Sequence, residues 1–190
     1  CFDANLDVWA AAATEIEDQA IRWVAEFVGF TAGAGAFTIG GTISNMTALA
    51  AARERAIPGS RRRGLGGGAP TVYWSEEAHY SIERAAEILG IGSGNVRSLP
   101  IDGNRRLVPE AVEEAIRADR AAGRVPVAVV ATAGTTLTGA VDPIDALADV
   151  CAEAGVWLHV DGAYGLPAAT TPSAGHLFAG LDRVDSVTLD

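Results

Sequence analysis

WLHVDGAY (157–164) is the segment with the clearest structural signal in this sequence. It is a short, apolar, β-prone run that ends in an acid, a pattern typical of a buried strand in a parallel sheet. In open α/β sheets, ligands bind just outside the carboxyl ends of the strands. Asp161, with the small residues Gly162 and Ala163 beside it, could hold a flat cationic nitrogen there. The same aspartate could equally cap a turn after the strand.

Helix and strand patterns alternate along the rest of the chain. Short β-prone runs alternate with stretches whose apolar residues recur at helical spacing. This alternation predicts right-handed βαβ units, and hence an α/β fold with a mostly parallel sheet and helices on both faces. The expected strands are 36–39, 71–74, 96–99, 127–132, 157–161 and 186–190, and the expected helices begin at about Thr14, Ile43, Ser81, Pro109 and Asp142-Pro143.

The first expected helix carries its own boundary signals. Thr14 and Glu17 form a capping-box pattern, and Gly29 is a stop signal. Its apolar residues recur at helical spacing and form one stripe: Ile16, Ala20, Trp23, Val24 and Phe27.

Composition excludes several classes of function. The 190 residues suffice for one sizeable core. The net charge of -10 argues against a nucleic-acid partner, which would require a basic face. The one basic cluster, Arg61-Arg62-Arg63, precedes several glycines and is expected to be a mobile, solvated loop. No apolar run approaches the ~18 residues of a membrane span, so no membrane partner is expected.

The cysteine and lysine content bears on disulfides, on the redox compartment and on which basic side chains are available. Only Cys1 and Cys151 occur, and Cys151 falls on the apolar face of an expected helix. This predicts a buried thiol without a disulfide and a reducing, cytoplasmic location. Every basic side chain other than histidine is arginine, because the sequence contains no lysine. No metal site is expected.

Two candidate groups lie at the ends of the first expected strands. Gly40-Gly41-Thr42 sits between a strand and a helix, where the helix N–H groups and the Thr42 hydroxyl would point at an anion. A tight structural turn explains these residues equally well. His79 follows the strand 71–74 and would either stack on a planar ring or serve as an ordinary helix-entry residue.

Hydroxyl and acidic side chains follow the later strands. Thr135 and Thr136 come directly after the strongest strand and are either loop hydroxyls or site residues. Asp142 could act as the N-cap of the helix that begins at Pro143.

His159 lies two residues before Asp161, on the same side of the pleat, and is interpreted as structural. The order of the candidate groups along the chain is more informative than any one of them, because all are expected at one edge of one sheet.

The sequence resembles the group II pyridoxal-phosphate-dependent decarboxylases, which act on glutamate, aromatic amino acids or histidine and have the aspartate-aminotransferase-like (type I) fold. The resemblance spans nearly the whole chain. It implies that residues 1–30 are a helical lead-in and residues 31–190 a large, cofactor-binding domain. The segments that carry it are FTIGGTISNM (37–46), AHYS (78–81), ATAGTT (131–136), GAVDP (139–143) and HVDGAY (159–164).

The resemblance implies pyridoxal 5'-phosphate as cofactor and two catalytic residues, Asp161 and His79. Asp161 would keep the pyridine nitrogen protonated, and His79 would stack on one face of the ring. Ala163 would underlie the opposite face. Gly162 stands where alanine is more usual in this family, a change that would leave the floor under the ring open.

Four further positions are implied to bind the cofactor. Gly41 and Thr42 would hold the phosphate. Thr136 would lie close to the cofactor, with Asp142 supporting its loop.

The resemblance also implies residues outside this sequence. The Schiff-base lysine of the family follows the strand that here begins at Ser186, in an Asp/Asn-x-His-Lys pattern whose first residue would be Asp190. The chain is therefore expected to be part of a longer enzyme that supplies the lysine, an N-terminal arm and a C-terminal small domain. A homodimer is implied by the resemblance alone.

The implied reaction is decarboxylation of an L-amino acid to an amine and carbon dioxide. Two alternatives stay open. One is another reaction of the same cofactor, such as aldehyde-forming oxidative decarboxylation or carbon–carbon lysis. The other is a non-catalytic scaffold protein that keeps the fold. The sequence does not select the amino acid substrate.

Overall fold

The computed structural model describes residues 11–31 and 33–190. Its centre is a five-stranded sheet in the order β2-β1-β3-β4-β5, in which every neighbouring pair is parallel. This confirms the parallel sheet expected from the alternation of elements. Cys1 and the first ten residues of the expected lead-in lie outside the described part of the chain. The strands are β1 (Pro70–Ser75), β2 (Val96–Leu99), β3 (Val125–Thr132), β4 (Trp157–Asp161) and β5 (Ser186–Thr188).

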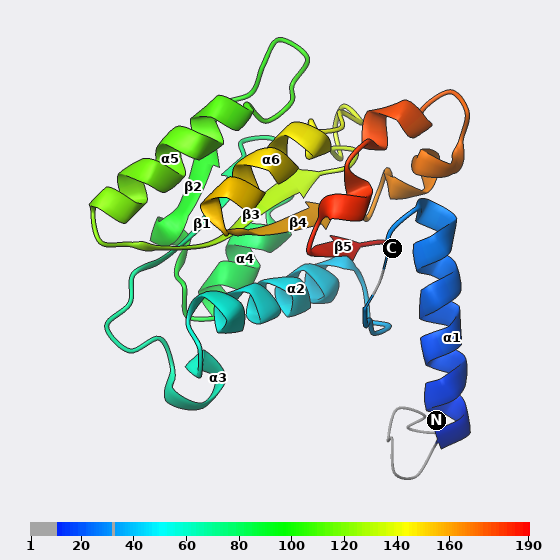
Figure 1. Ribbon diagram of the computed structural model, residues 1–190, viewed down its shortest axis with the longest axis horizontal. Helices are drawn as coiled ribbons and strands as arrows, with labels where there is room; N and C mark the ends of the chain where they lie inside the picture. Colours follow the sequence, from blue (N-terminus) through cyan, green and yellow to red (C-terminus); the bar gives the residue numbers. More distant parts are fainter. Residues whose placement is uncertain (1–10, 32) are drawn as a thin grey trace.

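Helices cover both faces of the sheet (Figure 1). On one face α2 packs against α4 and β3, and on the other α5 packs against α6 and β3. These four helices begin at or close to the positions expected from the sequence. They are α2 (Gly41–Ala56), α4 (Ser81–Ile88), α5 (Pro109–Ala121) and α6 (Ile144–Ala154), and the connections include the 3-10 helices η1 (Ser93–Asn95), η2 (Leu166–Thr170), η3 (Gly175–Phe178) and η4 (Leu181–Arg183).

Side chains alternate along β4 between two cores. Leu158 and Val160 are buried in the cluster formed with α5 and α6. Trp157 packs instead against the cluster formed with α2 and α4. Because successive side chains of a strand point to opposite faces of the sheet, His159 and Asp161 share the α2 face with Trp157. The pleat therefore directs Asp161 toward α2.

The first helix, α1 (Ala11–Val28), begins earlier than the sequence predicted. Thr14 lies inside the helix, and its buried hydroxyl has no hydrogen-bond partner among the described residues. Glu17 accepts a hydrogen bond from the distant backbone N–H of Phe37 at 3.0 Å. The predicted capping box is therefore wrong, because helical backbone is already established before Thr14.

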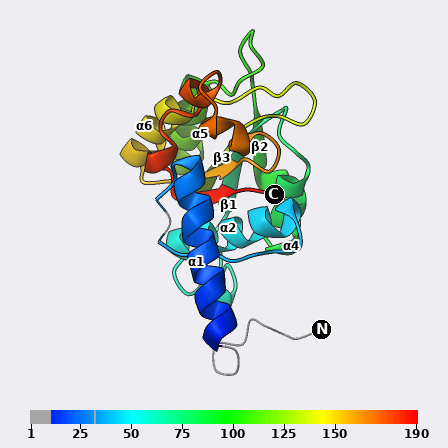
Figure 2. The ribbon, with the colours of Figure 1, turned by 90° about the vertical axis from the view of Figure 1, so that its right-hand side faces the viewer.

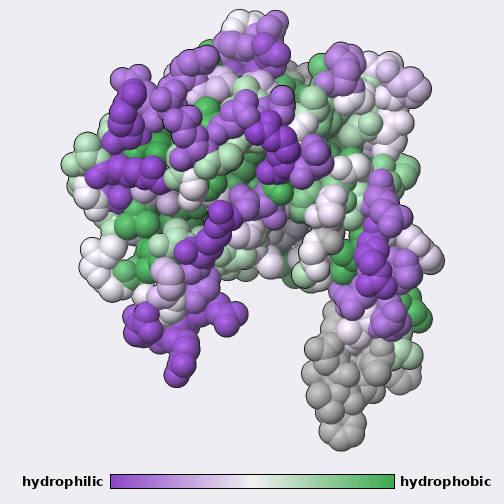
Figure 3. Space-filling view, viewed as in Figure 1, coloured by the Kyte–Doolittle hydropathy of each residue, from purple (hydrophilic) through white to green (hydrophobic). Residues whose placement is uncertain are grey.

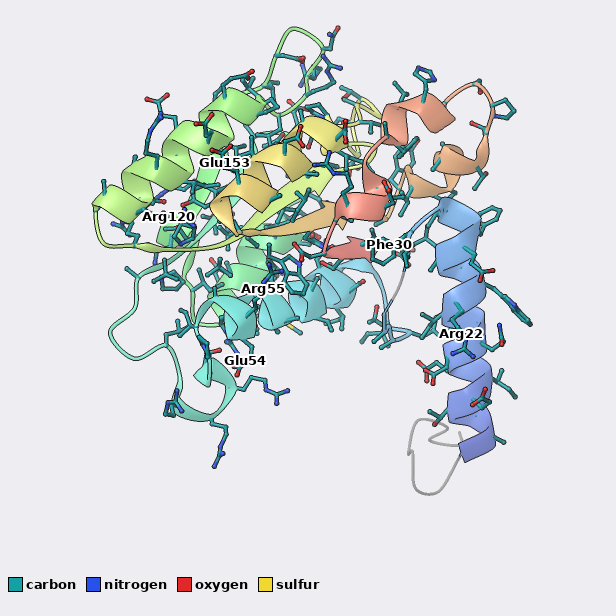
Figure 4. All side chains as sticks on the ribbon, in the orientation of Figure 1. Arg22, Phe30, Glu54, Arg55, Arg120 and Glu153 are labelled. Atoms are coloured by element: carbon teal, nitrogen blue, oxygen red, sulfur yellow. The ribbon has the colours of Figure 1, made fainter. Side chains whose placement is uncertain are left out.

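Much of the apolar stripe of α1 faces solvent. Figure 2 shows α1 running along one side of the molecule, with its N-terminal end projecting beyond the body. Ala25 and Val28 are buried, and Phe30, just after the helix, packs against the core (Figure 4). The exposed members of the stripe are Ile16 (70% exposed), Trp23 (64%) and Phe27 (62%).

Residues 36–39 do not form the predicted strand. Residues 36–38 have no regular secondary structure, Ile39 lies in a bend, and no strand of the described chain pairs with them. Ile39 is 93% exposed. A β-prone run without a neighbouring strand leaves its backbone groups without a ladder, so it remains a connection between α1 and α2.

The arginine cluster is also not the loop that its composition suggested. It belongs to a short helix, α3 (Ser60–Arg63), which forms a hydrophilic knob at the lower left of Figure 3. Glu54, at the end of α2, accepts hydrogen bonds from the backbone N–H groups of Gly59 and Arg61 and from the Ser60 hydroxyl (Figure 4). These bonds satisfy donors at the start of α3, and they lower the pKa of Glu54 to about 2.

Cys151 is a free, buried thiol on α6, as predicted. Burial raises its pKa to about 12. Among the described residues, no helix is long and apolar enough to cross a membrane.

Candidate active site

A cavity of about 290 Å³ opens beside the carboxyl end of β4, where ligands bind in sheets of this kind. It brings together six of the residues singled out in the sequence: Gly41, Thr42, His79, Thr136, Asp161 and Ala163. It is also lined by Asn45, Ser81, Thr132, Gly134, Tyr164 and Asp190. No group of three or more potential metal ligands occurs within 11–31 and 33–190.

Asp161 ends β4 and is only 6% exposed. Its Oδ2 accepts a hydrogen bond from Asn45 Nδ2 at 2.8 Å, and its Oδ1 accepts one from the backbone N–H of Ala163 at 3.2 Å. Both carboxylate oxygens are thus held by N–H donors, one from α2 and one from the loop after β4. A buried carboxylate held in this way is suited to a cationic partner in the cavity.

The start of α2 forms a second polar wall. Gly40 has a φ of 125°, which favours glycine, and its carbonyl accepts the first hydrogen bonds of the helix. The backbone N–H of Gly41 donates to Asp190 Oδ2 at 3.2 Å, so an anionic oxygen already lies at this helix N-terminus. A Cβ on Gly41 would lie 3.1 Å from the Cβ of Ala163, so a side chain here would crowd the cavity wall.

His79 lies between β1 and α4 and is half-buried. Its Nδ1 accepts a hydrogen bond from the backbone N–H of Ser81 at 3.3 Å, which places the proton of the neutral ring on Nε2. The ring also lies 4.2 Å from that of Tyr80, tilted by 42°. These contacts hold the imidazole at the cavity wall.

Asp142 does not line the cavity, although the sequence placed it among the cofactor-binding residues. Its carboxylate accepts hydrogen bonds from the backbone N–H groups of Leu107 and Thr132, each at 2.7 Å. Burial raises the pKa of Asp142 to about 6, against the effect of these two donors. Asp142 is not a helix N-cap either, because Pro143 occupies that position. It anchors the end of β3 from behind the cavity.

The hydroxyls at the end of β3 divide into two groups. Thr135 is buried and bonds within its own loop, to Thr138 Oγ1 at 2.7 Å. Thr136 is exposed and lines the cavity. Thr132 also lines the cavity, and its buried hydroxyl has no hydrogen-bond partner among the described residues. This orphaned hydroxyl is a polar group that a ligand could satisfy.

Gly162 does not open the floor of the cavity, contrary to expectation. A Cβ at this position would point away from the lining residues, 2.5 Å from the Cβ of Leu166 and 2.9 Å from the carbonyl oxygen of Thr188. The small residue is needed for packing behind the site.

Asn45 is the main site residue that the sequence did not single out. It lies one helical turn after Gly41, on the same side of α2, and it is 1% exposed. That spacing, with a polar side chain one turn inside a helix N-terminus, was the available signal. His159, interpreted as structural, is fully buried and contacts Asn45.

Comparison with known proteins relates this chain to one family. Residues 8–190 match the pyridoxal-dependent decarboxylase conserved domain. The chain is 42% identical to human cysteine sulfinic acid decarboxylase over 173 residues, which cover 90% of this chain and 35% of that protein.

Solved structures share the fold. The crystal structure of mouse CSAD has a TM-score of 0.86 and 40% identity, over 91% of this chain and 37% of that one. The structure of Oryza sativa TDC with PLP and tryptamine has a TM-score of 0.83 and 36% identity, over 95% of this chain and 39% of that one. The chain thus spans little more than a third of the length of these relatives. Its structural neighbours have the type I fold. Because the family model matches nearly all of its residues, the chain belongs to the pyridoxal-dependent decarboxylase family, whose cofactor is pyridoxal phosphate.

Proposed function

We propose that the longer protein containing this chain converts an L-amino acid to its amine and carbon dioxide with pyridoxal phosphate. One observation carries the proposal. A single cavity is lined both by the buried carboxylate of Asp161 and by the N-terminus of α2 at Gly41. A carboxylate suits a protonated pyridine nitrogen, and a helix N-terminus suits a phosphate. The family match over residues 8–190 supports this assignment.

The described residues fit the cofactor in two further respects. The Thr132 hydroxyl, buried at the cavity, lacks a partner among the described residues. His79 and Ala163 supply one aromatic and one small side chain to the cavity wall, as a flat ring requires.

Each residue then has a distinct task. When bound, pyridoxal phosphate would accept the electrons of the bond that breaks between the α-carbon and the departing carboxylate. Asp161 holds a proton at the pyridine nitrogen, which makes that sink effective. Gly41 and Thr42 bind the phosphate, and His79 covers the ring and limits the access of water.

The covalent anchor must come from elsewhere, because the 190 residues contain no lysine. We propose that the Schiff-base lysine follows Asp190 in the longer protein. Borohydride reduction of the loaded protein, followed by peptide mapping, would locate it. A modified lysine far from the residues that follow Asp190 would contradict this part of the proposal.

An amine-release assay of the full-length protein tests the proposed reaction. Relatives are named for cysteine sulfinic acid, and one structural neighbour holds tryptamine, so the panel needs acidic and aromatic amino acids as well as histidine and diamino acids. We expect an amine from at least one substrate, and a loss of about a hundredfold or more in kcat for Asp161→Ala. An aldehyde or a cleaved carbon chain would favour another reaction of the cofactor. An unchanged absorbance spectrum on adding pyridoxal phosphate would favour a scaffold protein.

We also propose that the full-length protein is a cytoplasmic homodimer. The free thiol of Cys151 supports a reducing compartment. The exposed apolar side chains of Ile16, Trp23 and Phe27 on α1 support a partner surface. Light scattering of the wild type and of Trp23→Asp tests the assembly: a wild-type monomer would contradict it.

A further inference from the structure

Asp161 is the last member of a chain of hydrogen bonds through β4, β5 and α2, which is partly buried at Trp157 and Ser186 and buried from His159 onward. Trp157 Nε1 lies 2.8 Å from Ser186 Oγ, which lies 2.9 Å from His159 Nδ1. His159 Nε2 lies 2.9 Å from Asn45 Oδ1, and Asn45 Nδ2 lies 2.8 Å from Asp161 Oδ2. The register of the sheet places His159 directly beside Ser186, so the fold itself brings these groups together.

The contact between Asn45 and Asp161 sets the direction of the bonds from His159 to Asp161. An indole N–H can only donate, and an ionised carboxylate can only accept. Ser186 Oγ therefore accepts from Trp157 and has its own proton to donate to His159 Nδ1. At the other end, Asn45 turns Nδ2 toward Asp161, which leaves Oδ1 to accept from His159 Nε2. The Asn45 end thus places a ring proton of His159 on Nε2, and the Ser186 hydroxyl can then donate to Nδ1 of the neutral ring.

The burial of His159 favours the neutral ring that this direction requires. Burial lowers the pKa of His159 to about 4, although the nearby Asp161 acts in the opposite direction. A neutral imidazole has one donor and one acceptor nitrogen. Thr188 Oγ1, at 3.4 Å, is a second and more distant neighbour of Nε2.

We propose that Asn45 is a positioning residue, whose amide is locked by His159 so that it always presents a donor to Asp161. The inference rests on the proposed function and deepens it. Asn45 and the backbone N–H of Ala163 together hold both oxygens of the carboxylate. Hydrogen bonds to a carboxylate favour its ionised form. Without the Asn45 bond, the carboxylate competes more strongly for the proton that it otherwise leaves on the pyridine nitrogen.

This orientation must be fixed because the side-chain amide of asparagine can flip, which exchanges the positions of Oδ1 and Nδ2. If His159 gave no N–H to Oδ1, Asn45 could present Oδ1 to Asp161, and two acceptor oxygens would meet in a buried site. The donor of His159 therefore acts on Asp161 through Asn45, without contact with the reacting atoms.

The test reads the proton on the pyridine nitrogen directly. The full-length protein is loaded with pyridoxal phosphate labelled with 15N in the ring, and the 15N chemical shift is followed against pH. The variants are Asn45→Leu, His159→Leu and His159→Gln, since a glutamine amide nitrogen reaches about as far as Nε2. The matched control is Tyr73→Phe. It removes another buried hydrogen bond to a carboxylate, the bond from Tyr73 OH to Asp119 at 2.9 Å. This bond lies on the other face of the sheet.

We expect the wild type and Tyr73→Phe to keep the pyridine nitrogen protonated near pH 7. In Asn45→Leu, deprotonation of that nitrogen should begin about one to two pH units lower than in the wild type. His159→Leu should shift in the same direction, and His159→Gln should restore much of the wild-type titration. A purely structural role would change thermal stability but would not separate the leucine variant from the glutamine variant.

Three results would overturn the inference. If Asn45→Leu and His159→Leu bind the cofactor and titrate like the wild type, Asn45 does not act on Asp161. If Asn45→Leu fails to fold, the two His159 variants provide the test. Equal titration of the pyridine nitrogen in His159→Leu and His159→Gln would show that His159 does not fix the orientation of the Asn45 amide. If the wild type gives no resonance from bound cofactor, the proposed function itself fails, and the inference with it.

Discussion

Gly134 and Gly165 lie in direct backbone contact: a Cβ on Gly134 would be 2.8 Å from the Cα of Gly165. Gly134, with a φ of 101°, belongs to the loop after β3, and Gly165 to the loop after β4. The neighbouring Tyr164 lines the cavity together with Gly134. Two loops that border the site are held together because neither glycine carries a side chain.

Gly165→Ala should therefore destabilise the protein and disturb the site. The new Cβ would overlap the carbonyl oxygen of Ala133 and lie 2.9 Å from the Cα of Gly134. We expect a cost of about 1–3 kcal/mol and weaker binding of pyridoxal phosphate. Melting curves with and without the cofactor measure both effects. Gly103→Ala is the control, because nothing lies within 4 Å of its Cβ position. Equal melting temperatures for the two variants would contradict the prediction.

Asp142→Ala should lower the unfolding free energy by about 2–5 kcal/mol, because the backbone N–H groups of Leu107 and Thr132 both lose their acceptor. Denaturant unfolding measures the loss. Asp149→Ala, which removes only an exposed ion pair with Arg183, should cost less than about 1 kcal/mol. A small effect at Asp142 would mean that water or a backbone shift satisfies both donors.

Lowering the pH should reduce the part of the unfolding free energy that depends on a neutral His159. Its folded-state pKa of about 4 lies below the ordinary value of 6.5, so protons bind preferentially to the unfolded chain between these values. The stability advantage of the wild type over His159→Gln should narrow by up to about 3 kcal/mol as the pH falls from 6.5 to 4. Asp142, with its pKa raised to about 6, titrates with the opposite sign but cancels in this difference.

Unfolding measurements of both proteins across this pH range check the prediction. A constant difference would show that His159 is already protonated in the native protein, or that it titrates alike in both states.

Cys151 should react with thiol reagents only when the chain opens. The thiol is 3% exposed, and burial raises its pKa to about 12, so little thiolate is available at neutral pH. Mass spectrometry of the peptide that contains Cys151 should show slow labelling, which urea accelerates. Leu137→Cys, at a position 85% exposed, is the control and should be labelled at once. Equally rapid labelling of both would mean that α6 opens readily.

Local patterns predicted most of the sheet and its covering helices. The alternation in β4 indicated that His159 and Asp161 share a face, and Gly155, with a φ of 60°, ends α6 as expected. Side-chain periodicity and glycine stops are properties of neighbouring residues, so they can be recognised in one sequence.

The sequence alone does not show which residues, far apart in the chain, contact one another in the fold. Residues 36–39 have strand composition but no neighbouring strand among the described residues, and Ile16, Trp23 and Phe27 of the α1 stripe stay exposed there. Asn45 and Asp161 are 116 positions apart, and no local pattern indicates that they touch. Asp142 looked like a cap because Pro143 follows it, whereas its actual donors come from Leu107 and Thr132.

The position of Ser186 in the chain has a consequence for biosynthesis. Asn45, His159 and Asp161 all leave the ribosome before it, and the hydroxyl that accepts from Trp157 is missing until β5 joins the edge of the sheet. His159 Nδ1 therefore lacks this donor until Ser186 has been synthesised. The hydrogen-bond chain that supports Asp161 is therefore complete only after β5 has paired with β4.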